Sequence, residues 1–188
     1  MLGRSVSEGW AEYMGLEWQG NDGTYLGDYE GISIRYFHLD VPPRIVDTAK
    51  TALDAYDSQI VFFKFCFEDF GANEGEGVRE KEEYIQQVYD EVVSKRHRKL
   101  IIGNALPQVE LYGTDGLKSN HRAYNEWLEQ FASTHANVRV LDLYDLLVDS
   151  NGNLKPEYAA SPEDSHVNNA AYERITPELM RAVREMLG

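Results

Sequence analysis

The sequence predicts an α/β protein of three layers, in which a parallel sheet is covered by helices on both faces. Two observations carry this prediction. Short apolar runs rich in β-branched and aromatic residues recur along the chain, and between them lie longer segments with apolar residues at helical spacing. Strands that alternate with helices form right-handed βαβ units, and a sheet built from such units is parallel.

In the first half of the chain, two strands flank one helix. Residues 32–39 (ISIRYFHL) begin with apolar and polar residues in alternation, which is typical of a strand. Two prolines follow, at a position that suits a helix start, and residues 44–56 carry apolar side chains at helical spacing. Residues 59–65 (QIVFFKF) are nearly all apolar, as expected of a strand that is buried on both faces.

The second half of the chain repeats the alternation. After an acidic, glycine-rich loop (EDFGANEGEG), residues 78–96 are charged but carry an apolar stripe, so we expect a surface helix. The run KLIIGNAL predicts a buried strand, NHRAYNEWLEQFAST a helix and NVRVLDL the last clear strand. A final helix is expected from about residue 168 to residue 187.

Composition and chain organisation narrow the class of protein. Neither a repeat nor a linker divides the 188 residues, so we expect a single domain over residues 1–188. A formal net charge of -14 repels phosphate backbones and argues against a nucleic-acid partner. No run approaches the roughly 18 apolar residues of a membrane span. The chain start lacks the pattern of a signal peptide, which weakly favours a cytoplasmic location. Cys66 is the single cysteine, so no internal disulfide is expected.

The N-terminal residues contain a candidate nucleophile. In the opening sequence MLGRSVSEGW, Ser5 follows an apolar residue and a glycine and precedes a predicted helix. A serine in a tight strand-to-helix turn exposes its hydroxyl at the edge of the sheet, and its own amide points to where an oxyanion would form. A serine that only caps the helix is the competing interpretation.

The C-terminal region contains a candidate base with two acids beside it. In SPEDSHVNN, His166 lies in a predicted loop before the last helix, with Glu163 three residues and Asp164 two residues earlier. An imidazole that acts as a base needs a carboxylate on one nitrogen, while its other nitrogen takes the serine proton. Taken alone, an exposed loop histidine beside capping acids would be the better explanation of the pattern.

Together the two ends resemble the SGNH hydrolases, also called GDSL-like esterases. The stretch GRSV resembles the Gly-Asp-Ser-Leu block of that family, and EDSHVN resembles its Asp-x-x-His block. The resemblance extends over nearly the whole chain in the order of elements. It implies a flavodoxin-like sheet of about five strands, and hydrolysis of small esters without a cofactor or metal. It assigns Ser5 as nucleophile and His166 as base.

The sequence departs from the family at the nucleophile turn and at the triad acid. Arg4 stands where the family has aspartate, a side chain that is not itself catalytic in that family. By spacing, the triad acid falls on Glu163, which the sequence slightly favours. Asp164 could serve instead from a different turn, so both acids stay candidates.

The oxyanion hole departs furthest from the family pattern. The family supplies an asparagine side chain within Gly-x-Asn-Asp, and the matching CFED has Glu68 in that place. A carboxylate cannot donate to an oxyanion unless it is protonated. Asp69 matches the last residue of the block and is expected to structure the loop. Asn104, at the end of the next strand, is one candidate for the missing donor, and a loop amide is another. The loop HLDVPP also lacks the glycine whose amide the family uses.

The first strand is short in this sequence. Only Met1 and Leu2 precede Gly3, whereas a central strand usually has about four to six residues. We therefore expect a first strand that is truncated or very short. Such a strand would leave neighbouring strands unpaired and favour association, so a homo-oligomer stays open.

Several aromatic residues lie just past Ser5 in the sequence. They are Trp10, Tyr13, Trp18, Tyr25 and Tyr29, most of them expected in the core. Some of them, Trp10 among them, are candidates for an acyl or sugar pocket, because aromatic faces stack on carbohydrate rings. The histidines show no metal-ligand spacing, and no glycine-rich phosphate loop follows a strand, so neither a metal nor a nucleotide cofactor is expected.

The sequence thus favours a serine esterase that acts on small acyl esters, with acetyl groups on carbohydrates among the candidates. The alternative is a catalytically silent relative that binds a carbohydrate or a protein through the same cleft. Glu68 in the oxyanion block favours the alternative, whereas the retained serine, histidine and acids favour the enzyme.

Overall fold

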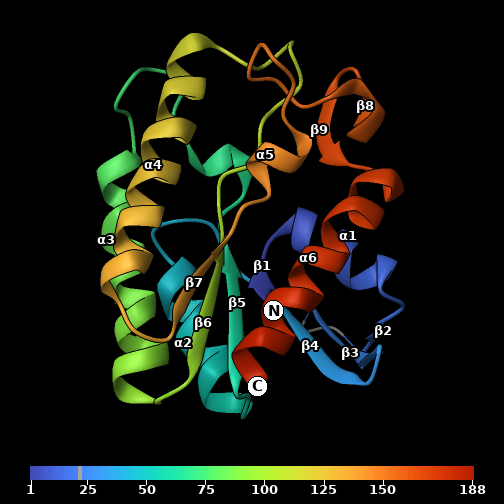
Figure 1. Cartoon of the computed structure of the whole chain (residues 1–188), viewed down its shortest axis with the longest axis vertical. Coiled ribbons are helices and arrows are strands. Elements are labelled where there is room, and N and C mark those ends of the chain that lie inside the picture. The colour runs from blue at the N-terminus through green and yellow to red at the C-terminus, as the bar shows by residue number, and fades with distance from the viewer. Residues whose placement is uncertain (21–22) are drawn as a thin grey trace.

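A computed structural model describes residues 1–20 and 23–188, and a seven-stranded sheet crosses its centre (Figure 1). The order of the strands is β2-β3-β4-β1-β5-β6-β7. Strands β4, β1, β5, β6 and β7 pair in parallel. These five strands are β1 (Leu2–Gly3), β4 (Ile32–His38), β5 (Ile60–Lys64), β6 (Lys99–Gly103) and β7 (Val138–Leu141).

The parallel strands follow the flavodoxin-like order. Numbered along the chain, their spatial order is 2-1-3-4-5, so the strand order reverses beside β1. In open α/β sheets, ligands bind outside the carboxyl ends of the strands at this switch point. The predicted three-layer fold class is confirmed, and β1 has the expected place at the centre of the sheet.

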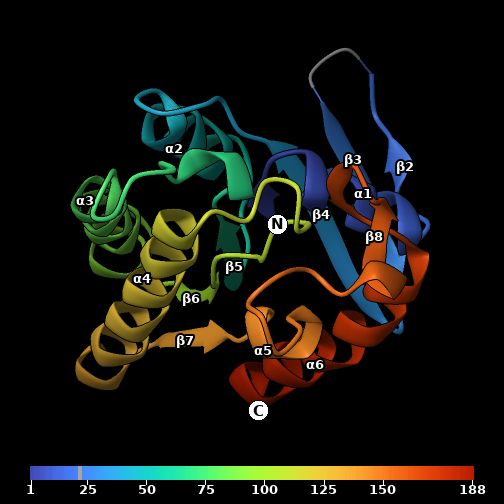
Figure 2. The same ribbon diagram turned by 90° about the horizontal axis from the view of Figure 1, so that it is seen from above.

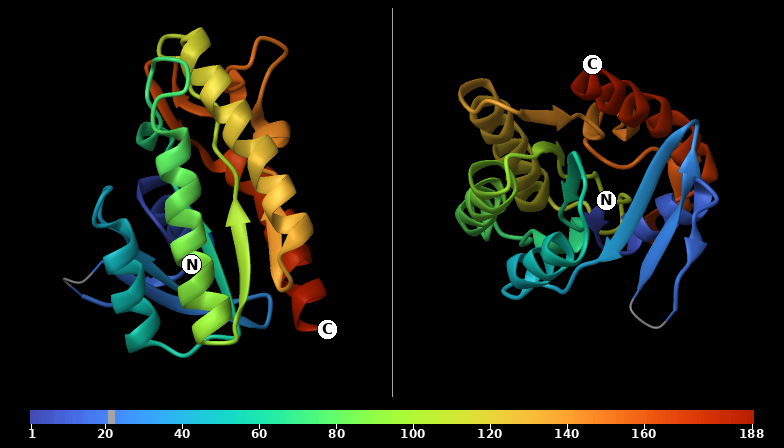
Figure 3. Two further views of the ribbon diagram at one scale, coloured as in Figure 1. Left: turned by 90° about the vertical axis from the view of Figure 1, so that its left-hand side faces the viewer. Right: turned by 90° about the horizontal axis from the view of Figure 1, so that it is seen from below.

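Helices cover both faces of the sheet (Figures 2 and 3). Two apolar cores result, one on each face. The first core is formed with α1 (Ser5–Tyr13), α5 (Tyr144–Leu147) and α6 (Asn169–Leu187). The second is formed with α2 (Ile45–Ala55), α3 (Val78–Tyr89) and α4 (Asp115–Thr134). None of the helices in the described ranges is both long and apolar enough to cross a membrane.

An antiparallel hairpin, which the sequence analysis did not predict, extends the sheet at one edge. It consists of β2 (Glu17–Trp18) and β3 (Thr24–Tyr29), and β3 pairs with β4 along its whole length. The aromatic and glycine residues of this segment obscured its alternation. All five aromatics considered for a substrate pocket belong to this hairpin or to α1.

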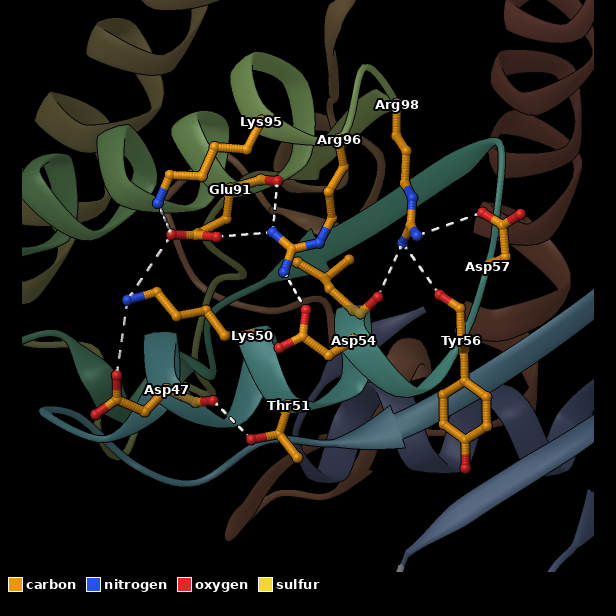
Figure 4. A network of polar contacts seen from close by, with 11 residues as sticks. Asp47, Lys50, Thr51, Asp54, Tyr56, Asp57, Glu91, Lys95, Arg96 and Arg98 are labelled. Atoms are coloured by element: carbon orange, nitrogen blue, oxygen red, sulfur yellow. Dashed lines mark hydrogen bonds and ion pairs between the residues drawn. The ribbon is translucent and has the colours of Figure 1, made fainter.

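The helix expected over residues 78–96 changes its geometry before it ends. After α3, residues Asp90–Lys95 form a π-helix, η2. The widened turn brings Lys95 and Arg96 back onto the carboxylate of Glu91, and Arg96 also reaches Asp54 on α2 (Figure 4). The basic run SKRHRK thus takes part in a network that joins α2 to the end of α3.

Three loops gather at the carboxyl edge of the parallel strands. The 3₁₀ turn η1 (Phe67–Asp69) follows β5, an irregular segment over residues 104–114 follows β6, and a small hairpin precedes α6. This hairpin joins β8 (Ala159–Ser161) to β9 (Asp164–Val167), shortly after the 3₁₀ turn η3 (Pro156–Tyr158). His166 therefore lies on a strand, where the sequence predicted a loop.

The opposite edge of the sheet holds a cavity of about 460 Å³. Because β1 contributes only Leu2 and Gly3, it pairs with β4 at two positions and with β5 at one. The remaining parts of β4 and β5 line the cavity together with α2 and α6. The strand β1 is thus very short, as expected from the sequence.

Candidate active site

Ser5 is the first residue of α1 and directly follows the two-residue strand β1 through Arg4. The turn needs glycine at position 3, because an added Cβ there would lie 2.2 Å from Ser7 Oγ. The helix can therefore begin immediately above the sheet. As an N-terminal helix residue, Ser5 also has an amide that no helical carbonyl accepts.

His166 reaches Ser5 from the strand β9. Its Nε2 lies 2.9 Å from Ser5 Oγ, and its Nδ1 lies 2.6 Å from Asp164 Oδ1. With the Nδ1 proton donated to Asp164, Nε2 is free to accept the serine proton. The ring of Phe67 packs edge-on against the imidazole, with the ring centroids 5.4 Å apart.

Asp164 takes the position for which the sequence favoured Glu163. In a strand, residues two apart point to the same side, so Asp164 and His166 share one face of β9 while Ser165 and Val167 are buried on the other. The backbone amide of His166 also donates to Asp164 Oδ1 at 2.9 Å. This hydrogen bond, followed by the one from the ring, lowers the pKa of Asp164.

Glu163 lies in the tight turn between β8 and β9, and its side chain is exposed. Its amide donates to Ser161 Oγ at 3.2 Å. Within residues 1–20 and 23–188, the Glu163 carboxylate has no hydrogen bond to the imidazole. The preference for Glu163 assumed a helix-like turn before the histidine, whereas the chain is extended there.

The buried face of β9 is hydrogen-bonded to a neighbouring loop. Ser165 is 3% exposed, and its Oγ accepts a hydrogen bond of 3.1 Å from the amide of Val109 in the segment after β6. In the same segment, Gln108 Nε2 donates to the carbonyl of Phe67 at 3.2 Å. The loops after β5 and β6 therefore hold β9 in place, and with it the position of His166.

Asp69 structures the η1 turn, as the sequence analysis expected. One of its oxygens accepts the amide of Cys66 at 2.8 Å, and the other accepts Arg4 Nη1 at 2.6 Å. The Asp69 side chain is only 4% exposed. It therefore joins the nucleophile turn to the end of β5 and does not itself face a substrate. This pair did not follow from the sequence, although a basic residue before Ser5 indicates an acid near it.

Asn104 does not supply an oxyanion donor. Its Nδ2 donates to Asp142 Oδ1 at 2.7 Å, and its Oδ1 accepts the amides of Leu143 and Tyr144. The side chain is buried and shapes the turn between β7 and α5. Its role as a donor, expected from its place after β6, is therefore wrong.

Trp10 is a core residue, not part of a substrate pocket. It is fully buried, and its Nε1 donates to Thr176 Oγ1 on α6 at 2.8 Å. Its ring packs against Phe62 and Tyr172. Trp10 fixes α1, and so Ser5, against α6.

A buried lysine beneath the site was also missed by the sequence analysis. Lys64, the last residue of β5, is 1% exposed and donates to the carbonyl of Phe65 at 2.6 Å. Burial lowers its pKa to about 8, although the nearby Cys66 and Asp69 act in the opposite direction. The signal was a lysine inside the otherwise apolar run QIVFFKF. Over the described part of the chain, no cluster of three or more His, Cys, Asp or Glu side chains is placed to hold a metal ion.

Comparisons with known proteins agree on the fold. No family model matches the chain, and no curated protein is significantly similar to it in sequence. Among solved structures, a GDSL-like lipase from Bacteroides thetaiotaomicron is 13% identical with a TM-score of 0.71, over 98% of this chain and 86% of that chain. A member of the lipolytic G-D-S-L family from Veillonella parvula is 18% identical with a TM-score of 0.63, over 96% and 94% of the two chains.

A third similar structure is a carbohydrate esterase of family 3 from Talaromyces cellulolyticus. It is 12% identical with a TM-score of 0.59, and the match covers 99% of this chain and 96% of that chain. At these identities the likeness concerns the backbone, and it extends over nearly the entire chain. The protein therefore has the fold of the SGNH/GDSL-like hydrolases.

Proposed function

We propose that the protein is a serine ester hydrolase that acts on small acyl esters through an acyl-enzyme. The observation that carries the proposal is the chain of contacts from Ser5 through His166 to Asp164, with distances of 2.9 Å and 2.6 Å. It lies at the carboxyl edge of the parallel sheet beside β1, where such folds bind their ligands. Both distances are within the reach required for a nucleophile, its base and an orienting acid.

In this mechanism Ser5 Oγ attacks the ester carbonyl while His166 Nε2 takes the hydroxyl proton. The carbonyl π electrons move onto oxygen, and the tetrahedral intermediate collapses as the bond to the alcohol breaks. His166 returns its proton to that alcohol, and the same steps with water release the acid. Asp164 holds the imidazole in the required tautomer and stabilises its charged form.

The substrate class is supported by the fold comparison. Proteins of the same fold include lipolytic G-D-S-L proteins and carbohydrate esterases. We therefore propose short acyl esters, with acetyl groups on carbohydrates among them, as the substrates. Because the backbone amide of Ser5 has no helical acceptor, it is one donor to the oxyanion.

The test is hydrolysis of p-nitrophenyl esters from acetate to octanoate by the purified protein and by Ser5→Ala. We expect Ser5→Ala to abolish the activity, and the dependence on chain length to measure the acyl pocket. Ser133→Ala is the matched control, because it removes an exposed serine hydroxyl on α4 that bonds only its own helix. Equal activity in the Ser5→Ala and wild-type proteins would contradict the proposal.

The second candidate is a catalytically silent module that binds a carbohydrate or a protein partner. Glu68, at the position where the family has its asparagine donor, is the observation that favours it. A fluorophosphonate probe separates the two candidates, because it labels an activated serine whatever the natural ester is. Labelling at Ser5 favours the hydrolase, and no labelling favours the silent module.

A further inference from the structure

Several hydrogen-bond donors at the carboxyl edge of the sheet are already engaged. After β4, the amide of Leu39 donates to the carbonyl of Gly3, and the amide of Asp40 donates to Thr48 Oγ1. After β5, the amide of Cys66 is held by Asp69. After β6, the side chain of Asn104 bonds within the turn that follows β7. None of these groups is free to meet an oxyanion formed at Ser5.

Glu68 stands where the resemblance places a donor, and it cannot donate while it is ionised. Its side chain is 66% exposed. A negative charge beside a developing oxyanion would also oppose the reaction. The side-chain donor of the family pattern is therefore absent at this position.

Arg4 places a cation beside the Glu68 side chain. It directly precedes Ser5, and Asp69 holds its Nη1 at 2.6 Å, so the guanidinium is directed toward the end of β5. Its Nη2 lies 4.0 Å from Glu68 Oε2, which is beyond hydrogen-bond distance. The side chain is 17% exposed, so most of it is covered by the protein and a part stays accessible to solvent.

Arginine has five N–H donors in a rigid, planar fork and keeps its charge at any working pH. Asp69 engages one terminal nitrogen of Arg4, and the other faces the position of Glu68. The pairing with Asp69 fixes the side chain before substrate arrives, which makes a donor effective in electrostatic catalysis. The adjacent Glu68 carboxylate then balances the charge of the arginine at the rim of the site.

We propose that Arg4 is a catalytic residue that donates a hydrogen bond to the oxyanion, together with the amide of Ser5. The inference rests on the proposed hydrolase function. When Ser5 Oγ bonds to the carbonyl carbon, the carbonyl oxygen gains the electron pair and Arg4 stabilises it without transferring a proton. When the intermediate collapses, the pair returns to the carbon–oxygen bond and the alcohol leaves with the proton from His166.

The experiment compares Arg4→Gln with the wild-type protein on p-nitrophenyl acetate. We expect kcat to fall about 100- to 1000-fold with KM little changed, because the donor acts on charge that exists only in the transition state. Binding of a boronic acid, which forms a tetrahedral anion on Ser5, should weaken in parallel. Arg79→Gln is the matched control, since it removes an exposed arginine that pairs only with Glu83 on α3.

Two further variants separate catalysis from folding. Arg4→Gln leaves the buried Asp69 without its cation, so Arg4→Gln/Asp69→Asn restores a neutral pair and should show the same loss of kcat with native stability. Glu68→Asn adds the family donor, and in that background Arg4→Gln should cost less than about 10-fold. Retention of kcat in Arg4→Gln, or an equal loss with and without Glu68→Asn, would overturn the role of Arg4.

Failure of the proposed function has a different signature. If the wild-type protein hydrolyses no ester and a fluorophosphonate does not label Ser5, the hydrolase proposal falls, and the role of Arg4 falls with it. If Ser5 is labelled and esters are hydrolysed, only the results on Arg4 decide this inference.

Discussion

Asp164 and His166 form their pair because a strand repeats every two residues. The same face of β9 presents both side chains, and the hydrogen bond from the His166 amide holds the carboxylate in place. The side chain of Asp164 is 46% exposed and that of His166 is 43% exposed. The orientation therefore depends on hydrogen bonds within β9 more than on burial.

The first prediction concerns the orienting acid. Asp164→Asn keeps the size of the side chain but favours the wrong imidazole tautomer, so we expect kcat to fall by about 10⁴-fold, the loss seen for the same change in chymotrypsin-like triads. Glu163→Gln is the control on the exposed neighbour and should change kcat less than about 3-fold. Kinetics on p-nitrophenyl acetate measure both variants, and a larger loss in Glu163→Gln would reverse the assignment.

The second prediction concerns His121, which is 1% exposed on α4. Burial, followed by the charge of Lys64, lowers its pKa to about 4 from the ordinary 6.5. Between pH 6.5 and 4 the unfolded chain binds a proton at this residue that the folded protein does not bind, so stability falls as the pH falls. By this linkage the free energy of unfolding should drop by roughly 2 to 3 kcal/mol over that range.

His121→Phe should remove this part of the acid loss. Urea unfolding at pH 4 and pH 6.5 compares the variant with the wild-type protein. The control is His97→Asn, which replaces an exposed histidine at a positive φ of 55°, a conformation that asparagine tolerates. Parallel pH profiles for the wild-type protein and His121→Phe would contradict the prediction.

The residues of the site differed in how far the sequence could place them. Ser5 and His166 could be proposed from the sequence, because each lies in a short local motif, one near each end of the chain. The choice between Glu163 and Asp164 depended on whether the chain before His166 was extended, and the β8–β9 hairpin that decides it has no strong alternation. The pairing of Arg4 with Asp69 joins positions 65 residues apart, which no local pattern could indicate.

Among the elements, η2 shows how an irregular helix positions charges. Glu91 is 8% exposed, and its carboxylate accepts Lys95 at 2.5 Å and Arg96 at 2.7 Å. The hydrogen bond from Lys95 has the larger effect and the one from Arg96 the next, and both lower the pKa of Glu91. Lys50 on α2 lies 3.9 Å from the same carboxylate, so the π-helix is joined to its neighbour by charge as well as by apolar contacts (Figure 4).

The third prediction follows from this network. Glu91→Gln leaves Lys95 without its counter-charge and leaves Arg96 paired with Asp54 alone, and we expect a loss of about 2 kcal/mol in the free energy of unfolding. Glu83→Gln is the matched control, because its exposed pair with Arg79 on the same helix should contribute less than about 0.5 kcal/mol. Chemical denaturation at neutral pH measures both. An equal, small effect would show that the network contributes no more than a surface ion pair.

The elements were predictable to different degrees for a physical reason. Strands β5 and β6 and helix α6 followed from long apolar runs or sustained helical spacing, and their observed bounds lie within a few residues of the expected ones. Neither the π-helix nor the β2–β3 hairpin was predicted from the sequence. The first is accompanied by charged contacts with α2 that are distant in sequence, such as Arg96 with Asp54, 42 residues apart. The second pairs at the edge of the sheet, where polar residues such as Asp28 face solvent.

At the scale of the whole molecule, the central strand β1 is the shortest of the parallel strands. Strand β4 extends back to Ile32 and β5 to Ile60, but β1 supplies partners only from Leu2 onward. The amino group of Met1 lies in this gap and donates to the carbonyl of Arg35, the position of a backbone amide in a parallel ladder. Burial lowers the pKa of this amino group to about 5.

The fourth prediction is that an added strand segment stabilises the protein. Four residues, Val-Ile-Val-Ile, placed before Met1 would run between β4 and β5, where α2 and α6 supply apolar surface on both faces. We expect the free energy of unfolding to rise by about 2 kcal/mol or more, which is a Tm increase of at least about 5 °C for a chain of this size. A Gly-Ser-Gly-Ser segment of the same length is the control: it also replaces the buried amino group by an amide, but it should stabilise less because it buries no apolar side chains.

The extension also has a consequence for pH dependence, because it converts the buried amino group into an amide. With a folded pKa of about 5 and an ordinary value of 8.0, that amino group makes stability fall as the pH falls from 8 to 5. The apolar extension removes this contribution by moving the amino group away from the sheet, so the stability of the extended protein should change less over that range. Thermal denaturation at pH 5 and pH 8 measures the difference. If both segments raised the Tm equally, the gain would come from removing the buried amino group alone, and the space before β1 would not act as a site for a strand.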